Sequence, residues 1–357
     1  MKKIVLIVVS LLLVSAMVFG CAPAAQTTTE AAATEAPAAE ATEAAAEATE
    51  APAANDDIVV AGIVFQDDQF MNMLTKGYQD AAADAGVKCL TDNTQNDQAK
   101  EVELINTYLA QGVDGVAIAP LSSDASVAAL KAADEQGMKV AITNINLTNA
   151  PFIVGGFTSD DYTNCQLVGQ VAAQILKEHY GDKTLKIAVV QFASLLPEIS
   201  GNRVKGYLDA LDAGGIKYEV VADQDAWMQD TALATADAII TANPDLDAII
   251  AVNDGGTIGS AQAVVNAGKS EQIMVFGHDG SEQIASMLLD DANPLQAVVA
   301  QDPYGQGYNA MSVLIKAIKG EDVSATQGKC QFLPGIVLSV LDKDAINAWV
   351  DTNYPAK

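Results

Sequence analysis

The sequence predicts an α/β protein built from two similar lobes, each a doubly wound, largely parallel sheet. Short apolar runs alternate with longer segments whose apolar residues recur every three or four positions. This alternation is typical of buried parallel strands separated by amphipathic helices. The whole pattern restarts after Gly156, and 357 residues suffice for two domains of about 150 residues each.

The first half of the folded part begins with the apolar run IVVAGIVF, followed by a segment in which Phe70, Leu74 and Tyr78 share one helical face. Gly86 ends that helix. Further strands are predicted at 87–91, 115–120, 139–143 and 152–156, and further helices over 98–111 and 123–136.

The second half repeats the alternation and closes with a tail at 335–350 that reads as one strand and one short helix. Strands are predicted at 185–192, 217–221, 246–252, 272–277 and 295–301, and helices over 160–179, 200–213, 230–242, 256–267, 281–291 and 303–319. Open α/β sheets bind ligands beyond the carboxyl ends of their strands, so we expect functional residues there.

Residues 1–56 have a different composition from the rest of the chain. Lys2 and Lys3 precede an apolar run over 4–18, which predicts a signal peptide at 1–21. The end of this segment, Val-Phe-Gly-Cys, resembles the lipobox of bacterial lipoproteins, which implies lipidation of Cys21. Residues 22–56 are rich in Ala, Glu and Thr and lack aromatic and branched aliphatic residues, so we expect a disordered tether.

Composition excludes several classes of function. A formal net charge of −27 argues against nucleic-acid binding, and so against the repressors of the lac type that share such a fold core. Cys89, Cys165 and Cys330 lack metal-ligand spacing, and we expect no metal or cofactor. No catalytic signature is found, and His278 beside Asp279 has no accompanying nucleophile, so we do not expect an enzyme.

Polar and aromatic side chains cluster where the predicted strands end. Asp accepts hydrogen bonds, Arg donates them, and Asn and Gln do both, so such a set can fix the hydroxyl groups of a small carbohydrate. Aromatic rings can cover the apolar faces of a sugar ring. The alternative is helix capping, which we favour for Asp67, Asp254 and Asp302 when each is taken singly.

Three motifs at these strand ends carry a resemblance to a known family. They are Asp-Asp-Gln-Phe-Met at 67–71, Val-Asn-Asp at 252–254 and Phe-Gly-His-Asp-Gly at 276–280. Through them the chain from 57 to 357 resembles the type I periplasmic monosaccharide-binding proteins of ABC importers, the ribose- and galactose/glucose-binding group. The resemblance implies a ligand site made of Asp68, Phe70, Asn144, Asp161, Arg203, Trp227, Asn253, Asp279 and Gln301.

The resemblance also implies the domain organisation and the partners. The N-terminal lobe would hold 57–158 plus 302–332 and the C-terminal lobe 159–301 plus 333–357, joined by three hinge crossovers. A monomer, held by its lipid to the outer face of the cytoplasmic membrane or in a periplasm, would close on a monosaccharide and dock on ABC permease subunits. The alternative is a sensor that presents its ligand to a chemoreceptor or kinase.

The ligand favoured by the resemblance is a hexose. Ile145 stands where the ribose-binding branch has Arg, which weakens a ribose assignment. The calcium loop of the galactose-binding branch has no counterpart at 181–186, and we expect no metal there. A pentose, inositol, a furanose autoinducer and a nucleoside remain open as ligands.

Overall fold

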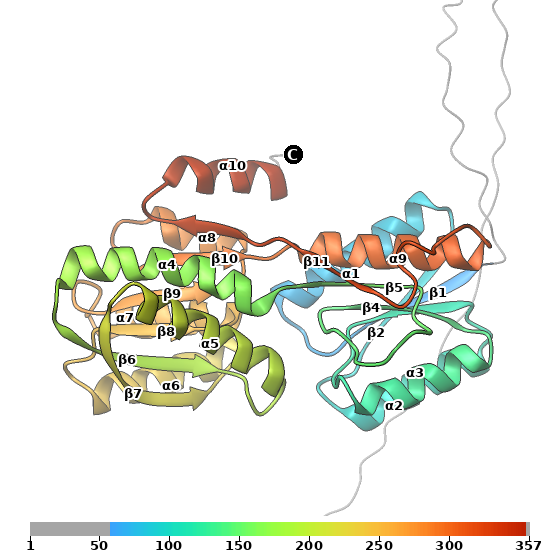
Figure 1. Cartoon of the computed structure of the whole chain (residues 1–357), viewed down its shortest axis with the longest axis horizontal. Helices are drawn as coiled ribbons and strands as arrows, with labels where there is room; N and C mark the ends of the chain where they lie inside the picture. Colours follow the sequence, from blue (N-terminus) through green and yellow to red (C-terminus); the bar gives the residue numbers. More distant parts are fainter. Residues whose placement is uncertain (1–57, 355–357) are drawn as a thin grey trace, which may run out of the picture. The chain divides into compact units, whose positions relative to one another are not determined.

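The computed structural model describes residues 58–354. Within these residues twelve strands and ten helices form two α/β lobes, each a six-stranded sheet with helices on both faces (Figure 1). This confirms the predicted fold class. The predicted signal peptide, Cys21 and the predicted tether lie outside the described residues.

The first sheet is parallel throughout and has the strand order β11-β5-β4-β3-β1-β2. Its strands are β1 (Val59–Val64), β2 (Lys88–Asn93), β3 (Gly115–Ile118), β4 (Lys139–Thr143), β5 (Gly155–Ser159) and β11 (Cys330–Leu333). The helices of this lobe are α1 (Gln69–Asp84), α2 (Gln98–Ala110), α3 (Ala125–Glu135) and α9 (Pro303–Ile318).

The second sheet repeats this arrangement in the order β12-β10-β9-β8-β6-β7, with β12 antiparallel to β10. Its strands are β6 (Thr184–Gln191), β7 (Lys217–Asp225), β8 (Ala248–Ala251), β9 (Met274–His278), β10 (Leu295–Ala300) and β12 (Ile336–Ser339). Its helices are α4 (Asp161–Tyr180), α5 (Pro197–Ala213), α6 (Gln229–Ala242), α7 (Asp254–Asn266), α8 (Glu282–Leu289) and α10 (Lys343–Asn353).

The strand order locates a crevice in each lobe. In the first sheet the chain leaves β1 toward β2 on one side and later returns to β3 on the other. The second sheet does the same around β6. The connections on the two sides of such a strand run in opposite directions. They therefore leave a crevice between them at the carboxyl end of that strand. The chain also passes from one sheet to the other three times, after β5, after β10 and after β11.

Three predicted boundaries and one omission need correction. β5 begins at Gly155 rather than 152, because a turn occupies the residues before it. β7 runs to Asp225, so the acidic residues before Trp227 belong to a strand and not to a loop. α5 begins at Pro197, whose fixed φ suits the first helical turn, and this places Arg203 in the second turn. β11 was not predicted.

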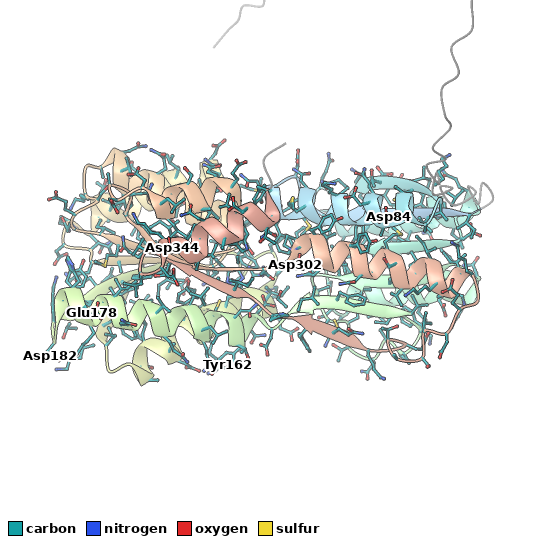
Figure 2. All side chains as sticks on the ribbon, turned by 90° about the horizontal axis from the view of Figure 1, so that it is seen from above. Asp84, Tyr162, Glu178, Asp182, Asp302 and Asp344 are labelled. Carbon is teal, nitrogen blue, oxygen red and sulfur yellow. The ribbon has the colours of Figure 1, made fainter. Side chains whose placement is uncertain are left out.

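Most of the acidic side chains among residues 58–354 are at least partly exposed. Figure 2 shows Asp84, Glu178 and Asp182 at the periphery of the described part, and all three are exposed. The strands of both sheets, in contrast, are largely apolar and buried. No helix among residues 58–354 is long and apolar enough to cross a membrane.

Helices α1 and α9 pack on one face of the first sheet at a close backbone contact. A Cβ on Gly77 would lie 2.3 Å from the carbonyl oxygen of Tyr304, and a Cβ on Gly307 would lie 2.2 Å from that of Leu74. Glycine at both positions therefore sets the distance between the two helices. That distance also fixes the position of α9, which begins at Pro303, just after the strand end at Gln301.

We expect Gly77→Ala to lower the free energy of unfolding by about 2 kcal/mol, because the new methyl group pushes α9 off the sheet. Gly201 offers a matched control, since it is an exposed residue of α5 with no atom near its missing Cβ. Gly201→Ala should raise stability by about 0.5 to 1 kcal/mol. Urea denaturation measures both, and equal effects would contradict the packing described.

Candidate functional site

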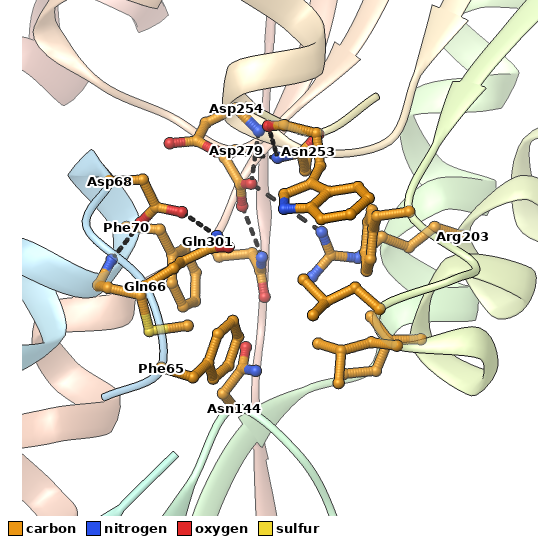
Figure 3. A pocket seen from close by; sticks show the side chains of 16 residues that line it. Phe65, Gln66, Asp68, Phe70, Asn144, Arg203, Asn253, Asp254, Asp279 and Gln301 are labelled. Carbon is orange, nitrogen blue, oxygen red and sulfur yellow. Dashed lines mark hydrogen bonds and ion pairs between the residues drawn. The ribbon is translucent and has the colours of Figure 1, made fainter. Parts of the chain in front are cut away.

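The carboxyl ends of the two sheets meet at a pocket that encloses about 400 Å³ of space not filled by protein atoms, part of it open to solvent (Figure 3). Eight of the nine residues predicted for the site line this pocket: Asp68, Phe70, Asn144, Arg203, Trp227, Asn253, Asp279 and Gln301. The ninth, Asp161, lies behind the wall. The pocket is therefore built from residues spread over more than 230 positions of the sequence.

Asp68 forms the end of the wall that follows β1. It is the N-cap of α1, where one carboxylate oxygen accepts a hydrogen bond of 2.8 Å from the backbone N–H of Met71. The other oxygen accepts one from the side-chain amide of Gln66. Capping thus holds the carboxyl group at the pocket, and the prediction that Asp67 caps this helix was wrong.

Asp279 forms the opposite wall, after β9. Its backbone is left-handed, with φ of 72°, a conformation that Asp tolerates better than most residues. One carboxylate oxygen accepts a hydrogen bond from Gln301 at 2.6 Å, and the other accepts one from the backbone N–H of Asp254 at 3.0 Å. The carboxyl group is therefore fixed in direction before any ligand arrives.

Asn253 and Asp254 both line the pocket, but the capping role predicted for Asp254 belongs to Asn253. Asn253 caps α7 through Gly256, at 3.1 Å, and its amide also donates to the carbonyl oxygen of Trp227 at 2.8 Å. Asp254, which we expected to be the cap, is the first residue of the helix and lines the pocket instead. Its predicted capping role was wrong because the helix begins at Asp254, one residue earlier than that role requires.

Among the described residues, Arg203 is the only cationic side chain that lines the pocket, and it is 5 % exposed. Its Nε donates to Asp161 at 2.7 Å, and Nη1 donates to the carbonyl oxygen of Val252 at 2.9 Å. Nη1 also lies 3.9 Å from a carboxylate oxygen of Asp279. Asp161 therefore positions Arg203 and borders a neighbouring groove rather than the pocket itself.

Aromatic rings cover the pocket from both lobes. Phe65 and Phe70 come from the first lobe, and Phe192 and Trp227 come from the second. The Arg203 guanidinium lies over the Phe192 ring at 5.3 Å, which shields the cation from one side. The indole N–H of Trp227 is buried and has no hydrogen-bond partner among the described residues. It is therefore available as a donor for a ligand.

Asn144 is held in place by a helix distant in sequence. Its backbone is left-handed, with φ of 65°, and its backbone N–H lies 3.2 Å from the side-chain oxygen of Gln306 on α9. Gln306 is fully buried and also donates to Ser159 at the end of β5, at 3.2 Å. The Gln306 side-chain amide thus connects the part of the pocket wall at Asn144 to β5, the strand after which the chain first passes to the second sheet.

Burial and like charges raise the pKa values of the pocket carboxyl groups. Burial raises the pKa of Asp68 to about 6, with a contribution from Asp279. Burial, together with Asp68 and Asp279, raises the pKa of Asp254 well above its usual range. The pKa of Asp279 is also raised, again by burial, although Arg203 opposes the shift. The carboxyl groups of the two walls therefore oppose one another's ionisation.

His278 is fully buried behind Asp279. Its Nδ1 lies 3.2 Å from the thiol sulfur of Cys165, and its Nε2, 3.8 Å from Asp279, has no hydrogen-bond partner among residues 58–354. Burial, with Arg203 nearby, lowers the pKa of His278 well below its usual range. The imidazole is thus neutral and walled off from the pocket surface.

Sequence reasoning missed half of the lining. The residues not assigned to the site are Phe65, Gln66, Met71, Phe192, Leu195, Leu196, Ile199 and Asp254. The internal repeat could have identified part of the missed lining, because the loop after β6 in the second lobe is the equivalent of the loop after β1 in the first. Asp225 accepts hydrogen bonds from the backbone N–H groups of Ala193 and Ser194, at 2.9 and 2.7 Å, and so holds that loop against the pocket.

Residues 58–322 match the family described as Periplasmic binding protein domain. The chain belongs to this family. The family consists of solute-binding proteins, and the expected group, sugar-binding proteins of ABC importers, is confirmed. Among similar proteins, the ABC transporter periplasmic-binding protein YphF of Escherichia coli is 29 % identical over 69 % of this chain and 76 % of its own. A putative rhizopine-binding protein of Rhizobium meliloti is 28 % identical over 76 % and 87 %.

Solved structures share the fold at lower identity. A solute-binding protein of Bacillus halodurans with bound myo-inositol has a TM-score of 0.72 at 18 % identity, covering 82 % of this chain and 98 % of its own. A protein of Agrobacterium radiobacter in complex with D-arabinose has the same TM-score at 20 % identity, with 82 % and 98 % covered. These likenesses support the two-lobed periplasmic-binding-protein fold.

We expect Asp161→Asn to lower the free energy of unfolding by about 3 kcal/mol or more, because Arg203 stays buried and loses its charged partner. Asp160→Asn is the matched control. Asp160 is the exposed N-cap of the same helix, and Asn caps as well as Asp does, so stability should change by less than about 0.5 kcal/mol. Urea denaturation distinguishes the two, and similar losses would remove Asp161 from this role.

Asp68 should make stability depend on pH. Its pKa is raised to about 6, so the folded state binds the proton more tightly than the unfolded state, in which the pKa is about 3.9. The stabilisation is therefore full below pH 4 and is lost as pH rises through 6, by about 3 kcal/mol. Asp68→Asn keeps the cap and removes the charge. It should stabilise the protein at about pH 7.5 and leave it unchanged at about pH 4, and a gain of equal size at both values would contradict the shift.

Proposed function

We propose that the protein captures a monosaccharide, with a hexose favoured, between its two lobes and delivers it to the permease subunits of an ABC importer. The observation that carries this proposal is the pocket itself, where fixed hydrogen-bonding groups and aromatic rings from both sheets surround one small space. Asp68, Phe70, Asn144, Arg203, Trp227, Asn253, Asp279 and Gln301 would contact the ligand, with Asp161 behind Arg203.

The chemistry of the walls supports a polyhydroxylated ring as ligand. Asp279 presents a carboxylate already aligned by Gln301, and Arg203 presents donors already aligned by Asp161. Such charge-assisted hydrogen bonds fix hydroxyl groups in place. A ligand that lacks one of these hydroxyl groups leaves a buried polar group unpaired, which costs about 1–3 kcal/mol. The rings of Phe70 and Trp227 would cover the apolar faces of the ligand.

The relatives support the same class of ligand. They include a D-ribose/D-allose-binding protein of Pseudomonas aeruginosa, 29 % identical over 60 % of this chain and 67 % of its own. The solved structures carry D-allose, D-arabinose and myo-inositol. A cyclic polyol of the size of a pentose or hexose fits this range of ligands and the fixed groups of the pocket.

Capture would proceed by closure of the lobes. The pocket needs residues of both lobes, so a ligand that binds all of them favours the closed arrangement over an open one. It shifts that equilibrium only by its preference for the closed state. The three crossovers would serve as hinges between lobes formed by 57–158 plus 302–332 and by 159–301 plus 333–357. The closed form would dock on the permease.

The proposal includes export, a lipid anchor and binding without catalysis. The signal at 1–21 would export the chain, lipid on Cys21 would hold it at the membrane, and 22–56 would act as a tether. Behind the pocket wall, His278 is neutral and fully buried, so it is not placed to exchange protons with a ligand. We therefore propose that the bound sugar leaves unchanged and that the protein acts as a monomer.

A calorimetric titration of the purified protein against pentoses, hexoses, inositols and nucleosides tests this function. We expect one monosaccharide or cyclitol to bind with a dissociation constant in the micromolar range or below. We expect Asp279→Asn, which keeps the left-handed backbone, to weaken that binding at least about tenfold, since it removes a charged acceptor. Asp302→Asn, at the exposed cap of α9, is the control and should bind as the wild type does.

Two results would contradict the proposal. Binding of a nucleoside or a non-carbohydrate in preference to every sugar and cyclitol would exclude the proposed ligand class. Unchanged affinity in Asp279→Asn would show that the ligand binds elsewhere on the protein.

A further inference from the structure

The pocket contains more acidic than basic groups. Asp68, Asp254 and Asp279 line it, and Arg203 is the only cationic side chain in the same lining. Arg203 is already engaged, because Asp161 binds its Nε at 2.7 Å. A neutral sugar would leave this surplus negative charge uncompensated. Burying unpaired carboxylates is unfavourable unless they bind a cation or take up a proton.

The acidic groups face one another across the pocket rather than pointing away from it. Asp68 comes from the wall of the first lobe, and Asp254 and Asp279 come from the wall of the second (Figure 3). Asp254 accepts hydrogen bonds at its Oδ1, from Gly255 at 2.7 Å and Asn253 at 3.2 Å. No described residue donates to its Oδ2. This carboxylate therefore keeps an acceptor free.

A second, neutral group at the same end of the pocket also lacks a donor. Gln66 is 9 % exposed and lines the pocket, and its amide nitrogen donates to Asp68. This fixes the side-chain oxygen as an acceptor, and that oxygen is buried without a hydrogen-bond partner among residues 58–354. One end of the pocket thus presents acceptors of both kinds, and what it lacks is a donor.

The groove next to the pocket has the same electrostatic character. It shares Asn144 and Ile199 with the pocket and adds Asp160, Asp161 and Glu198, and no Lys, Arg or His of residues 58–354 lines it. A cleft lined by charges of one sign raises the local concentration of oppositely charged ligands. The acidic lining of the groove therefore favours a cation beside the pocket.

We propose that the natural ligand is an aminated monosaccharide or cyclitol, whose protonated primary amine lies between Asp68 and Asp254 within reach of the side-chain oxygen of Gln66. This inference rests on the proposed function and narrows its ligand class. An ammonium group donates three hydrogen bonds and carries one positive charge, whereas a hydroxyl group in the same place donates one and carries none. The ring hydroxyl groups would remain with Asp279, Arg203 and Asn144.

Proton exchange should distinguish the two kinds of ligand. Asp68 is faced by Asp254 and Asp279 from the other lobe and by Asp67 from its own loop, while Asp279 is also faced by Arg203 and His278. Burial and these like charges raise the pKa of Asp68 to about 6 and that of Asp254 well above its usual range. An ammonium group would restore their ionised forms, so its binding should release protons. A neutral sugar should release none.

The test uses matched triads in isothermal calorimetry with the purified protein: an amino sugar, its parent sugar and its N-acetyl derivative, for glucose, galactose and inositol. In at least one triad we expect the amine to bind at least tenfold tighter than the parent. Acetylation of the amine, which removes its positive charge, should weaken binding at least tenfold. Repeating the best titration in buffers of different ionisation enthalpy should show proton release, with affinity for the amine rising from about pH 5 to about pH 7.

The variants locate the amine. Asp68→Asn keeps the cap of α1, and Asp254→Asn keeps an oxygen for Gly255, so both should fold, as circular dichroism can verify. Each should weaken binding of the amine at least tenfold more than it weakens binding of the parent sugar. Asp67→Asn, one residue away, exposed and outside the pocket lining, is the control and should bind both ligands as the wild type does.

Three outcomes would overturn the inference. If the parent sugar binds as tightly as the amine in every triad, the amine is excluded while the proposed function stands. If the amine binds tightly but neither Asp68→Asn nor Asp254→Asn discriminates against it, its place in the pocket is wrong. If no sugar or cyclitol of either kind binds, the proposed function fails, and this inference fails with it.

Discussion

The buried guanidinium of Arg203 is the constraint on which the rest of the pocket depends. A cation that is only 5 % exposed is stable only when charged and polar partners surround it. Those partners come from separate elements: Asp161 from the start of α4, the carbonyl oxygen of Val252 from the end of β8, and Asp279 from the end of β9. Satisfying one side chain therefore fixes where three strand and helix ends meet, and the pocket forms in front of them.

Helix capping and the proposed ligand binding involve the same residues at this site. Asp68 caps α1 and Asn253 caps α7, and both line the pocket. This double use follows from the fold, because each helix begins just beyond the carboxyl end of a strand and these ends converge. A cap residue is held rigidly by backbone N–H groups, so it loses little further freedom when a ligand binds. The two functions that we weighed as alternatives are compatible.

Much of the fold was predictable because the patterns that indicate its strands and helices are local in the sequence. Alternating apolar runs and amphipathic segments predicted both sheets, and the family resemblance carried by motifs at the strand ends implied eight lining residues. The errors arose where long-range contacts decide. β11 exists because it pairs with β5, whose residues lie 174 positions earlier. The loop after β6, which lines the pocket, is held by Asp225 from the neighbouring strand β7. Asp254 was missed because a one-residue difference in the start of α7 decides which of two neighbours caps it. The surplus negative charge of the pocket becomes apparent only when the residues of both walls are considered together.

A crystal structure of the protein with its tightest-binding ligand tests most directly whether the two strand-end walls act as one binding site. We expect electron density for a single small ring between Phe70 and Trp227, with polar ligand atoms within hydrogen-bonding distance of Asp279 and Arg203. We also expect both lobes to contact it. A ligand that occupied the groove near Glu198 alone, or that touched only one lobe, would show that the pocket described here is not the binding site.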